Sequence, residues 1–250
     1  MIDFHTHILP AVDDGAKTEE ISAQMLRALQ DQGVGEVLLT PHYYAQKRSA
    51  EAFLTARNEA FEKICTAVPD GMKIRLGAEV RLTGVNDPSD DALCSLAIEG
   101  TKCVLIEFPF LQTWSLHLIE RVRSFTTETG YIPVLAHVER YIPILSKPKI
   151  LQELMEAGCL FQVNTGAFYQ KPVQRFALTL LKKDMVHCLG TDAHDLENRA
   201  PDYTQAIEAV KSAGLEKEWQ HAIARMENLL RGKKIHPTYT PVKKFLGKFY

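Results

Sequence analysis

The amino-acid sequence predicts an α/β protein whose parallel strands close into a seven-stranded (βα) barrel. Short apolar runs rich in β-branched residues alternate with longer amphipathic segments, as in successive βα units joined by right-handed crossovers. Seven such units follow one another, and no linker rich in glycine, serine or proline divides them. The length of 250 residues is also usual for a single-domain α/β barrel. An open, doubly wound sheet is the alternative.

The seven expected strands are short runs of four to eight apolar residues bounded by turn signals. The second contains Pro41, which should end it because a proline cannot continue a hydrogen-bonded strand. In chain order the strands are expected at residues 1–7, 36–42, 73–80, 103–108, 132–137, 160–164 and 186–191.

Helical patterns fill the intervals between these strands. The first begins near Thr18 and places Ile21, Met25 and Leu29 on one face, which is the spacing of an amphipathic helix. A second helix is expected at residues 50–67, and two more follow the last strand, at 202–213 and 216–230.

Composition excludes several classes of protein. Hydrophobic residues make up 46% and charged residues 24%, which excludes general disorder. Lys and Arg number 29 against 31 Asp and Glu, so no basic field favours nucleic acid and no nucleic-acid partner is expected. No secretory pattern opens the sequence, and no apolar stretch reaches the ~20 residues of a membrane span, so membrane insertion is not expected. Five scattered cysteines without a C-x-x-C pair favour reduced thiols and a cytoplasmic location.

The last twenty residues differ from the rest. Residues 231–250 hold six Lys or Arg, no acid, two prolines and several aromatic residues. We therefore expect one catalytic barrel domain at residues 1–230 and a separate basic, aromatic segment at 231–250. That segment is either a terminal extension, packed on the outside of the barrel or mobile, or a tail that binds a partner.

Nearly every expected strand ends in a residue that can bind metal. The carboxyl ends of parallel strands converge on one face, where the active sites of α/β barrels lie. The H-x-H at the end of the first strand and the D-x-H after the seventh place two side chains each on a shared face. The sixth strand, ending at Asn164, offers no obvious ligand. The residues concerned are His5, His7, His42, Glu79, Glu107, His137, Asp192 and His194.

A single histidine of this kind is more often structural, but the whole set is hard to explain that way. Mixed imidazole and carboxylate ligands favour Mn²⁺, Fe or Zn²⁺. The set exceeds the needs of one ion, which indicates two or three metals, with Glu79 able to bridge. The loop Asp13-Asp14-Gly15 is either a turn or the source of a further carboxylate ligand.

The order of these motifs resembles a known family. The opening M-I-D-F-H-T-H-I-L-P-A-V-D-D-G-A-K-T is similar to bacterial tyrosine-protein phosphatases of the polymerase-and-histidinol-phosphatase (PHP) superfamily, which belong to capsular and exopolysaccharide gene clusters. The similarity extends from Met1 to about Leu230. The other motifs are T-P-H at 40–42, G-A-E at 77–79, I-E-F-P at 106–109, A-H-V-E-R at 136–140 and G-T-D-A-H at 190–194.

The resemblance implies a distorted, TIM-like seven-stranded barrel of PHP type with three divalent metal ions, Mn²⁺ foremost, and Fe, Zn²⁺, Co²⁺ or Mg²⁺ as alternatives. It assigns one metal to His5, His7, Glu79 and Asp192. It assigns the second to Glu79, Glu107 and His137, and the third to Asp14, His42 and His194. Arg140 and Arg199 match arginines that the family uses near phosphate.

The absence of several sequence motifs excludes other kinds of catalytic or nucleotide-binding site. Thiol-based tyrosine phosphatases need C-x5-R, and no cysteine has an arginine six positions later. The P-loop motif, the dinucleotide fingerprint and G-x-S-x-G are also absent from the sequence. Lys47, Arg48 and Arg81, with Tyr43 and Tyr44 nearby, are either ordinary surface residues or the rim of a peptide site.

The sequence therefore predicts a metal-dependent protein-tyrosine phosphatase that uses a metal-activated water. By resemblance, its substrate is the tyrosine-rich tail of a bacterial tyrosine kinase that controls polysaccharide synthesis. A small-molecule phosphatase such as histidinol phosphatase, and a non-catalytic barrel that binds the kinase, are the alternatives. Whether the chain forms a homo-oligomer is left open.

Overall fold

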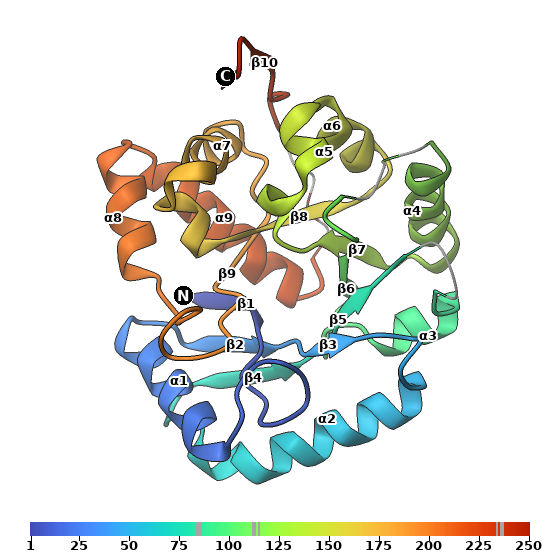
Figure 1. Ribbon diagram of the computed structural model, residues 1–250, viewed down its shortest axis with the longest axis vertical. Coiled ribbons are helices and arrows are strands. Elements are labelled where there is room, and N and C mark those ends of the chain that lie inside the picture. The colour runs from blue at the N-terminus through green and yellow to red at the C-terminus, as the bar shows by residue number, and fades with distance from the viewer. Residues whose placement is uncertain (84–86, 112–113, 115, 234, 236–237) are drawn as a thin grey trace.

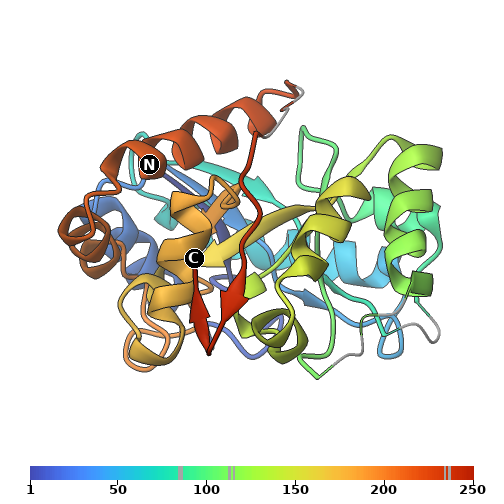
Figure 2. The ribbon, with the colours of Figure 1, turned by 90° about the horizontal axis from the view of Figure 1, so that it is seen from above.

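A computed structural model describes residues 1–83, 87–111, 114, 116–233, 235 and 238–250. Nine strands run parallel to their neighbours in two curled sheets, and helices surround them (Figures 1 and 2). The three-stranded sheet has the order β1 (Ile2–Thr6), β2 (Glu36–Leu39), β4 (Lys73–Leu76). The six-stranded sheet has the order β3 (His42–Tyr43), β5 (Glu79–Arg81), β6 (Cys103–Glu107), β7 (Ile132–Leu135), β8 (Leu160–Asn164), β9 (Cys188–Gly190).

The second and third expected strands are each broken in two, between β2 and β3 and between β4 and β5. Pro41 lacks the N–H that a continuous ladder needs at the first break. At the second, a side chain on Gly77 would lie 3.1 Å from Ile98 and 3.2 Å from Thr40, so the backbone bends where the packing is tight. The expected ring of seven continuous strands is therefore replaced, in the described residues, by a curled parallel sheet in two parts.

The outer edges of the two sheets meet near the ends of β1 and β9. Thr6 and Ala193 form an isolated parallel bridge. His7 N donates to Ala193 O at 2.9 Å, and Asp192 N donates to His5 O at 2.8 Å. The first and last segments of the sheet are thus joined where the expected metal ligands lie.

Helices follow the strands in the expected alternation. Thr18, Ser49 and Ser89 each cap a helix by accepting a backbone N–H, which confirms the predicted start of the first helix. The helices are α1 (Glu19–Asp31), α2 (Ala50–Ile64), α3 (Asp90–Ser95), α4 (Leu116–Thr129), α5 (Ile142–Ser146), α6 (Lys149–Glu156), α7 (Lys171–Lys182), α8 (Thr204–Ser212) and α9 (Glu216–Leu230). Short 3₁₀ turns are η1 (Cys65–Ala67), η2 (Val138–Arg140) and η3 (Thr165–Phe168).

One continuous apolar core fills the space between sheet and helices, and all residues of β1 and β6 are buried. Within the described residues, no helix has both the length and the apolar character needed to cross a membrane. The basic C-terminal segment, of which residues 234 and 236–237 lie outside the described part, ends in an antiparallel hairpin of β10 (Lys244–Phe245) and β11 (Lys248–Phe249).

Candidate metal centre and phosphate site

The carboxyl ends of the strands gather all nine expected metal ligands at one site. Their nitrogen and oxygen atoms form four overlapping groups, and within each group the atoms lie within 4.8 Å of one another. The groups are His7, Asp14, His42 and His194; His5, Glu79 and His137; His5, His7 and Asp192; and His42, Glu79 and Glu107. Because residues recur between groups, the cluster has donors for more than one cation. Asp14, which the sequence left open between turn and ligand, falls in the first group.

Several of these atoms are buried and lack a hydrogen bond, although other ligand atoms lie close to them. Glu79 Oε2, Asp192 Oδ1 and His194 Nε2 have no hydrogen-bond partner among the described residues. His5 Nε2 lies 3.0 Å from His7 Nε2 and 3.3 Å from Glu79 Oε2, so atoms with lone pairs crowd together. A buried polar atom without a partner costs free energy, and a divalent cation would satisfy these atoms at once. The donor set therefore fits metal ions, and its mix of nitrogen and oxygen suits Mn²⁺, Fe or Zn²⁺.

Electrostatics keeps the two central carboxylates ionised. Burial would raise the pKa of Glu79, but His5, His42 and His137 outweigh it and hold that pKa well below its usual range. Burial is likewise outweighed at Asp192, mainly by His5, and its pKa is also well lowered. At Glu107 burial and the neighbouring Glu79 carboxylate raise the pKa. A cation placed among them would stabilise the ionised form of all three.

Two of the ligand residues have strained backbones. His137 has φ 35° and Asp192 has φ 54°, both in the left-handed region that residues with a side chain rarely adopt. Such conformations persist where surrounding contacts fix them, often at functional sites. Each residue lies two positions after a strand end, and both side chains belong to the cluster.

Asp13 is a functional residue that the sequence did not single out from its loop. Its Oδ2 lies 2.7 Å from His7 Nδ1 and accepts from His42 N at 2.8 Å. Its Oδ1 accepts from Gly15 N at 2.9 Å. Asp13 therefore fixes the orientation of the His7 ring and leaves Nε2 facing the cluster, as the second layer of metal sites commonly does. The Asp-Asp-Gly sequence was the signal, but it did not show which carboxylate turns inward.

The sixth expected strand contributes side-chain amides to the site. These amides hydrogen-bond to the expected metal ligands and are not expected ligands themselves. Gln162 Oε1 accepts from His137 N at 2.7 Å and lies 3.2 Å from His5 Nδ1. Gln162 Nε2 donates to Asn164 Oδ1 at 2.9 Å, and Asn164 Nδ2 donates to Asp192 Oδ2 at 3.0 Å. This chain of amides ties three of the ligand residues to β8.

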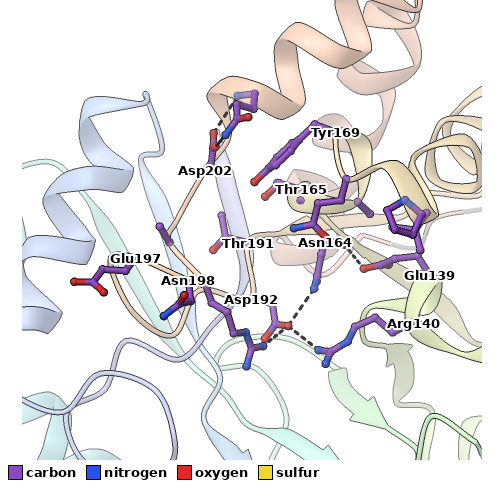
Figure 3. A pocket seen from close by; sticks show the side chains of 18 residues that line it. Glu139, Arg140, Asn164, Thr165, Tyr169, Thr191, Asp192, Glu197, Asn198 and Asp202 are labelled. Carbon is purple, nitrogen blue, oxygen red and sulfur yellow. Dashed lines mark hydrogen bonds and ion pairs between the residues drawn. The ribbon is translucent and has the colours of Figure 1, made fainter.

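Arg140 and Arg199 converge on the same oxygen. Both donate to Asp192 Oδ2, at 3.2 Å and 2.6 Å (Figure 3). The other carboxylate oxygen, Asp192 Oδ1, lies 3.3 Å from His7 Nε2. Their side chains remain 40% and 36% exposed. They border a cavity of about 480 Å³ whose wall includes Asn164 and Tyr169. The two guanidinium groups thus stand between the metal ligands and an open cavity, where they can reach an anion.

A second cavity, of about 520 Å³, lies beside Asp14 and His42. Tyr44, Lys47 and Arg48 line it, and Lys47 Nζ lies 4.4 Å from the centre of the Tyr44 ring. Tyr43, which the sequence placed near this rim, is a core residue instead, 3% exposed. Adjacent residues of a strand point to opposite faces, so one of the two tyrosines had to turn inward.

Comparison with known proteins assigns the family. The family model described as "Capsular polysaccharide synthesis, CpsB/CapC" matches residues 1–229. The chain belongs to the CpsB/CapC family. It is 31% identical over 246 residues to the tyrosine-protein phosphatase YwqE of Bacillus subtilis, covering 94% of this chain and 93% of YwqE. It is 32% identical over 231 residues to the tyrosine-protein phosphatase CpsB of Streptococcus pneumoniae, covering 84% and 89%.

Solved structures agree with this assignment to the CpsB/CapC family. A chain from the crystal structures of YwqE and CpsB, described as unique metal-dependent tyrosine phosphatases, matches with a TM-score of 0.83 and 28% identity. The match covers 98% of this chain and 100% of that one. A probable 2-pyrone-4,6-dicarboxylic acid hydrolase of Acinetobacter baumannii, at 17% identity and a TM-score of 0.56, shares the fold alone.

Proposed function

We propose that this protein is a metal-dependent protein-tyrosine phosphatase. The observation that carries the proposal is the junction at Asp192, where one carboxylate oxygen faces the histidine cluster and the other faces Arg140 and Arg199. Metal donors and anion-binding groups therefore adjoin each other, as hydrolysis of a phosphate ester requires. Divalent cations, when bound, would lower the pKa of a coordinated water and offset charge on the phosphoryl oxygens.

For the ligands we propose three metal ions, Mn²⁺ foremost, held as the family resemblance implies. One would bind His5, His7, Glu79 and Asp192, and the second Glu79, Glu107 and His137. The third would bind Asp14, His42 and His194. The close approach of these donors and the unpaired Glu79 Oε2 support a bridging role for Glu79.

For the arginines we propose contact with the non-bridging phosphoryl oxygens. A planar guanidinium can hold two oxygens at once, and its contribution grows as charge develops in the transition state. The leaving phenolate of tyrosine has a pKa near ~10, so it departs with little need for a general acid. Residues of the chain thus position the phosphate ester and stabilise the transition state, and no side-chain nucleophile is required.

For the wider setting we propose one catalytic domain at residues 1–230 whose seven strands, two of them broken, form a distorted barrel. The bridge between Thr6 and Ala193 supports closure. The free cysteines support a cytoplasmic location. The membership in a capsular polysaccharide family supports a phosphorylated bacterial tyrosine kinase, through its tyrosine-rich tail, as the substrate.

One comparison of substrates tests the proposal. Mn²⁺-loaded protein should hydrolyse a phosphotyrosine peptide with a far higher kcat/KM than histidinol phosphate. The reverse preference would identify a small-molecule phosphatase. Failure to hydrolyse even a chromogenic phosphate ester with any of the proposed metals would favour a non-catalytic binding barrel.

A further inference from the structure

The basic C-terminal hairpin, residues 243–250, has a fixed shape. Lys244 and Phe249 pair across its strands, and Lys243 and Tyr250 exchange two backbone hydrogen bonds of 3.0 Å. Leu246 and Gly247 form the turn with φ of 47° and 75°, which matches the right-handed twist of a tight hairpin. The backbone of the hairpin therefore holds its side chains in a defined arrangement on the surface.

Its attachment places it beside the site. The Phe249 ring packs 4.7 Å from Phe176 of α7, and Lys244 Nζ donates to Leu145 O of α5 at 2.6 Å. Helix α5 begins two residues after Arg140, and α7 also contacts η2, which carries Arg140. Figure 1 shows the hairpin at the top of the view, projecting from the body of the molecule next to these helices.

The outward face of the hairpin combines positive charge with uncovered apolar side chains. Phe245 is 65% exposed, Leu246 83% and Tyr250 54%. Lys243 and Lys248 are exposed beside them. Residues 231–250 contain no Asp or Glu, so no acid of this segment offsets the lysines. On α5, Ile142 is 53% exposed and extends the apolar surface towards Arg140.

We propose that the basic hairpin, together with Ile142, is a docking surface for acidic segments of the phosphotyrosine protein on which the site acts. The inference rests on the proposed function and names a second contact for the same substrate. Charge complementarity selects the partner, because a chain rich in carboxylates and phosphates is attracted to clustered lysines. Apolar side chains of that chain would cover Phe245 and Leu246. The contact of Lys244 with α5, a helix that begins two residues after Arg140, favours a protein substrate over a lipid surface.

The test compares a long substrate, which can contact both the site and the hairpin, with a small one that can contact the site alone. Lys243→Glu/Lys248→Glu reverses exposed charges on the hairpin, and Phe245→Ser/Leu246→Ser removes its apolar tip. The substrates are a phosphorylated copolymer of Glu and Tyr, and para-nitrophenyl phosphate. Each variant should lose about tenfold in kcat/KM on the copolymer, mainly through KM, and should keep wild-type kcat/KM on para-nitrophenyl phosphate. Added salt should shrink the difference from wild type for the charge-reversed variant.

The matched control is Lys211→Glu/Lys217→Glu, which reverses two exposed charges at α8 and α9 and should leave both activities unchanged. Equal activity of the hairpin variants and wild type on the copolymer would overturn the proposal. So would loss of binding to vesicles of anionic phospholipid with copolymer turnover intact, which would make the hairpin a membrane contact. If the wild type hydrolysed neither substrate, the proposed function would fail, and binding of the labelled copolymer to wild type and variants would still decide the docking surface.

Discussion

The carboxylate of Asp13 and the imidazole of His7 are paired through Asp13 Oδ2 and His7 Nδ1, 2.7 Å apart. Both side chains are buried, and the pKa of His7 is raised well above its usual value because Asp13 outweighs the effect of burial. The pair fixes which ring nitrogen faces the metal ligands. One loop carboxylate thus orients the histidine that follows β1, while its neighbour Asp14 reaches His42 and His194 at 3.5 and 3.6 Å.

Asp13→Asn should weaken metal binding without unfolding the chain. The amide keeps the shape of the side chain but removes the negative charge that favours Nδ1–H on His7, and loss of such a partner typically costs about 10- to 100-fold in metal affinity. Titration of the apoprotein with Mn²⁺ by calorimetry measures the change, and circular dichroism checks the fold. Asp31→Asn, an exposed change at the end of α1, is the control. Unchanged affinity in Asp13→Asn would show that the pair does not orient His7.

Arg140→Ala and Arg199→Ala should each lower kcat/KM on a phosphotyrosine peptide by about 100-fold, the usual cost of losing a group that stabilises transition-state charge. Because both arginines contact Asp192 Oδ2, their effects should not add in the double variant. Steady-state kinetics on all three variants measures this. Arg27→Ala, an exposed arginine of α1, should keep full activity. If Arg140→Ala and Arg199→Ala also kept full activity, neither arginine would belong to the phosphate site.

The convergence of the expected metal ligands could be predicted from the sequence because it follows a rule of the fold. Parallel strands end on one side, so His5, His42 and Glu79 had to converge once the strands were located. Nothing comparable marks Gln162 or Asn164, since neutral amides are common in strands and carry no metal signature. Their role depends on which neighbours they meet, and that follows from tertiary packing.

The same limit applies to the strand breaks and the tail. Pro41 predicts an interruption, but the crowding at Gly77, where an added Cβ would lie 3.1 Å from Ile98, involves a residue that is remote in sequence. The composition of residues 231–250 showed a basic, aromatic segment. Its position on the molecule depends on the contact of Phe249 with Phe176, some seventy positions earlier. Long-range packing of this kind leaves no local pattern.

Chelation and thiol alkylation should act very differently on activity. Burial raises the pKa of Cys103 to about 11 and that of Cys159 to about 12, so neither forms a reactive thiolate near neutral pH. Cys188 is fully buried, and Cys65 lies exposed at the start of η1 and belongs to none of the ligand groups. Iodoacetamide should therefore leave most activity, whereas EDTA should abolish it and Mn²⁺ restore it. Loss of activity on alkylation that persisted in Cys65→Ser would point to an essential thiol.

His187 predicts how stability depends on pH. Burial lowers its pKa from 6.5 to about 3, and Nδ1 accepts from Phe161 N at 3.0 Å, so the ring is neutral in the folded chain. Between pH 3 and 6.5 the unfolded chain binds the extra proton, so the contribution of His187 to stability falls as pH falls through that window. The loss from pH 6.5 to 5 is about 2 kcal/mol. His187→Asn keeps an acceptor for Phe161 N but cannot titrate, so its free energy of unfolding should fall less over this range. Urea unfolding of both chelated proteins at the two pH values measures the difference, with Val186→Ala as a control that lowers stability equally at both. Equal slopes for wild type and His187→Asn would mean that His187 is not held neutral by the fold.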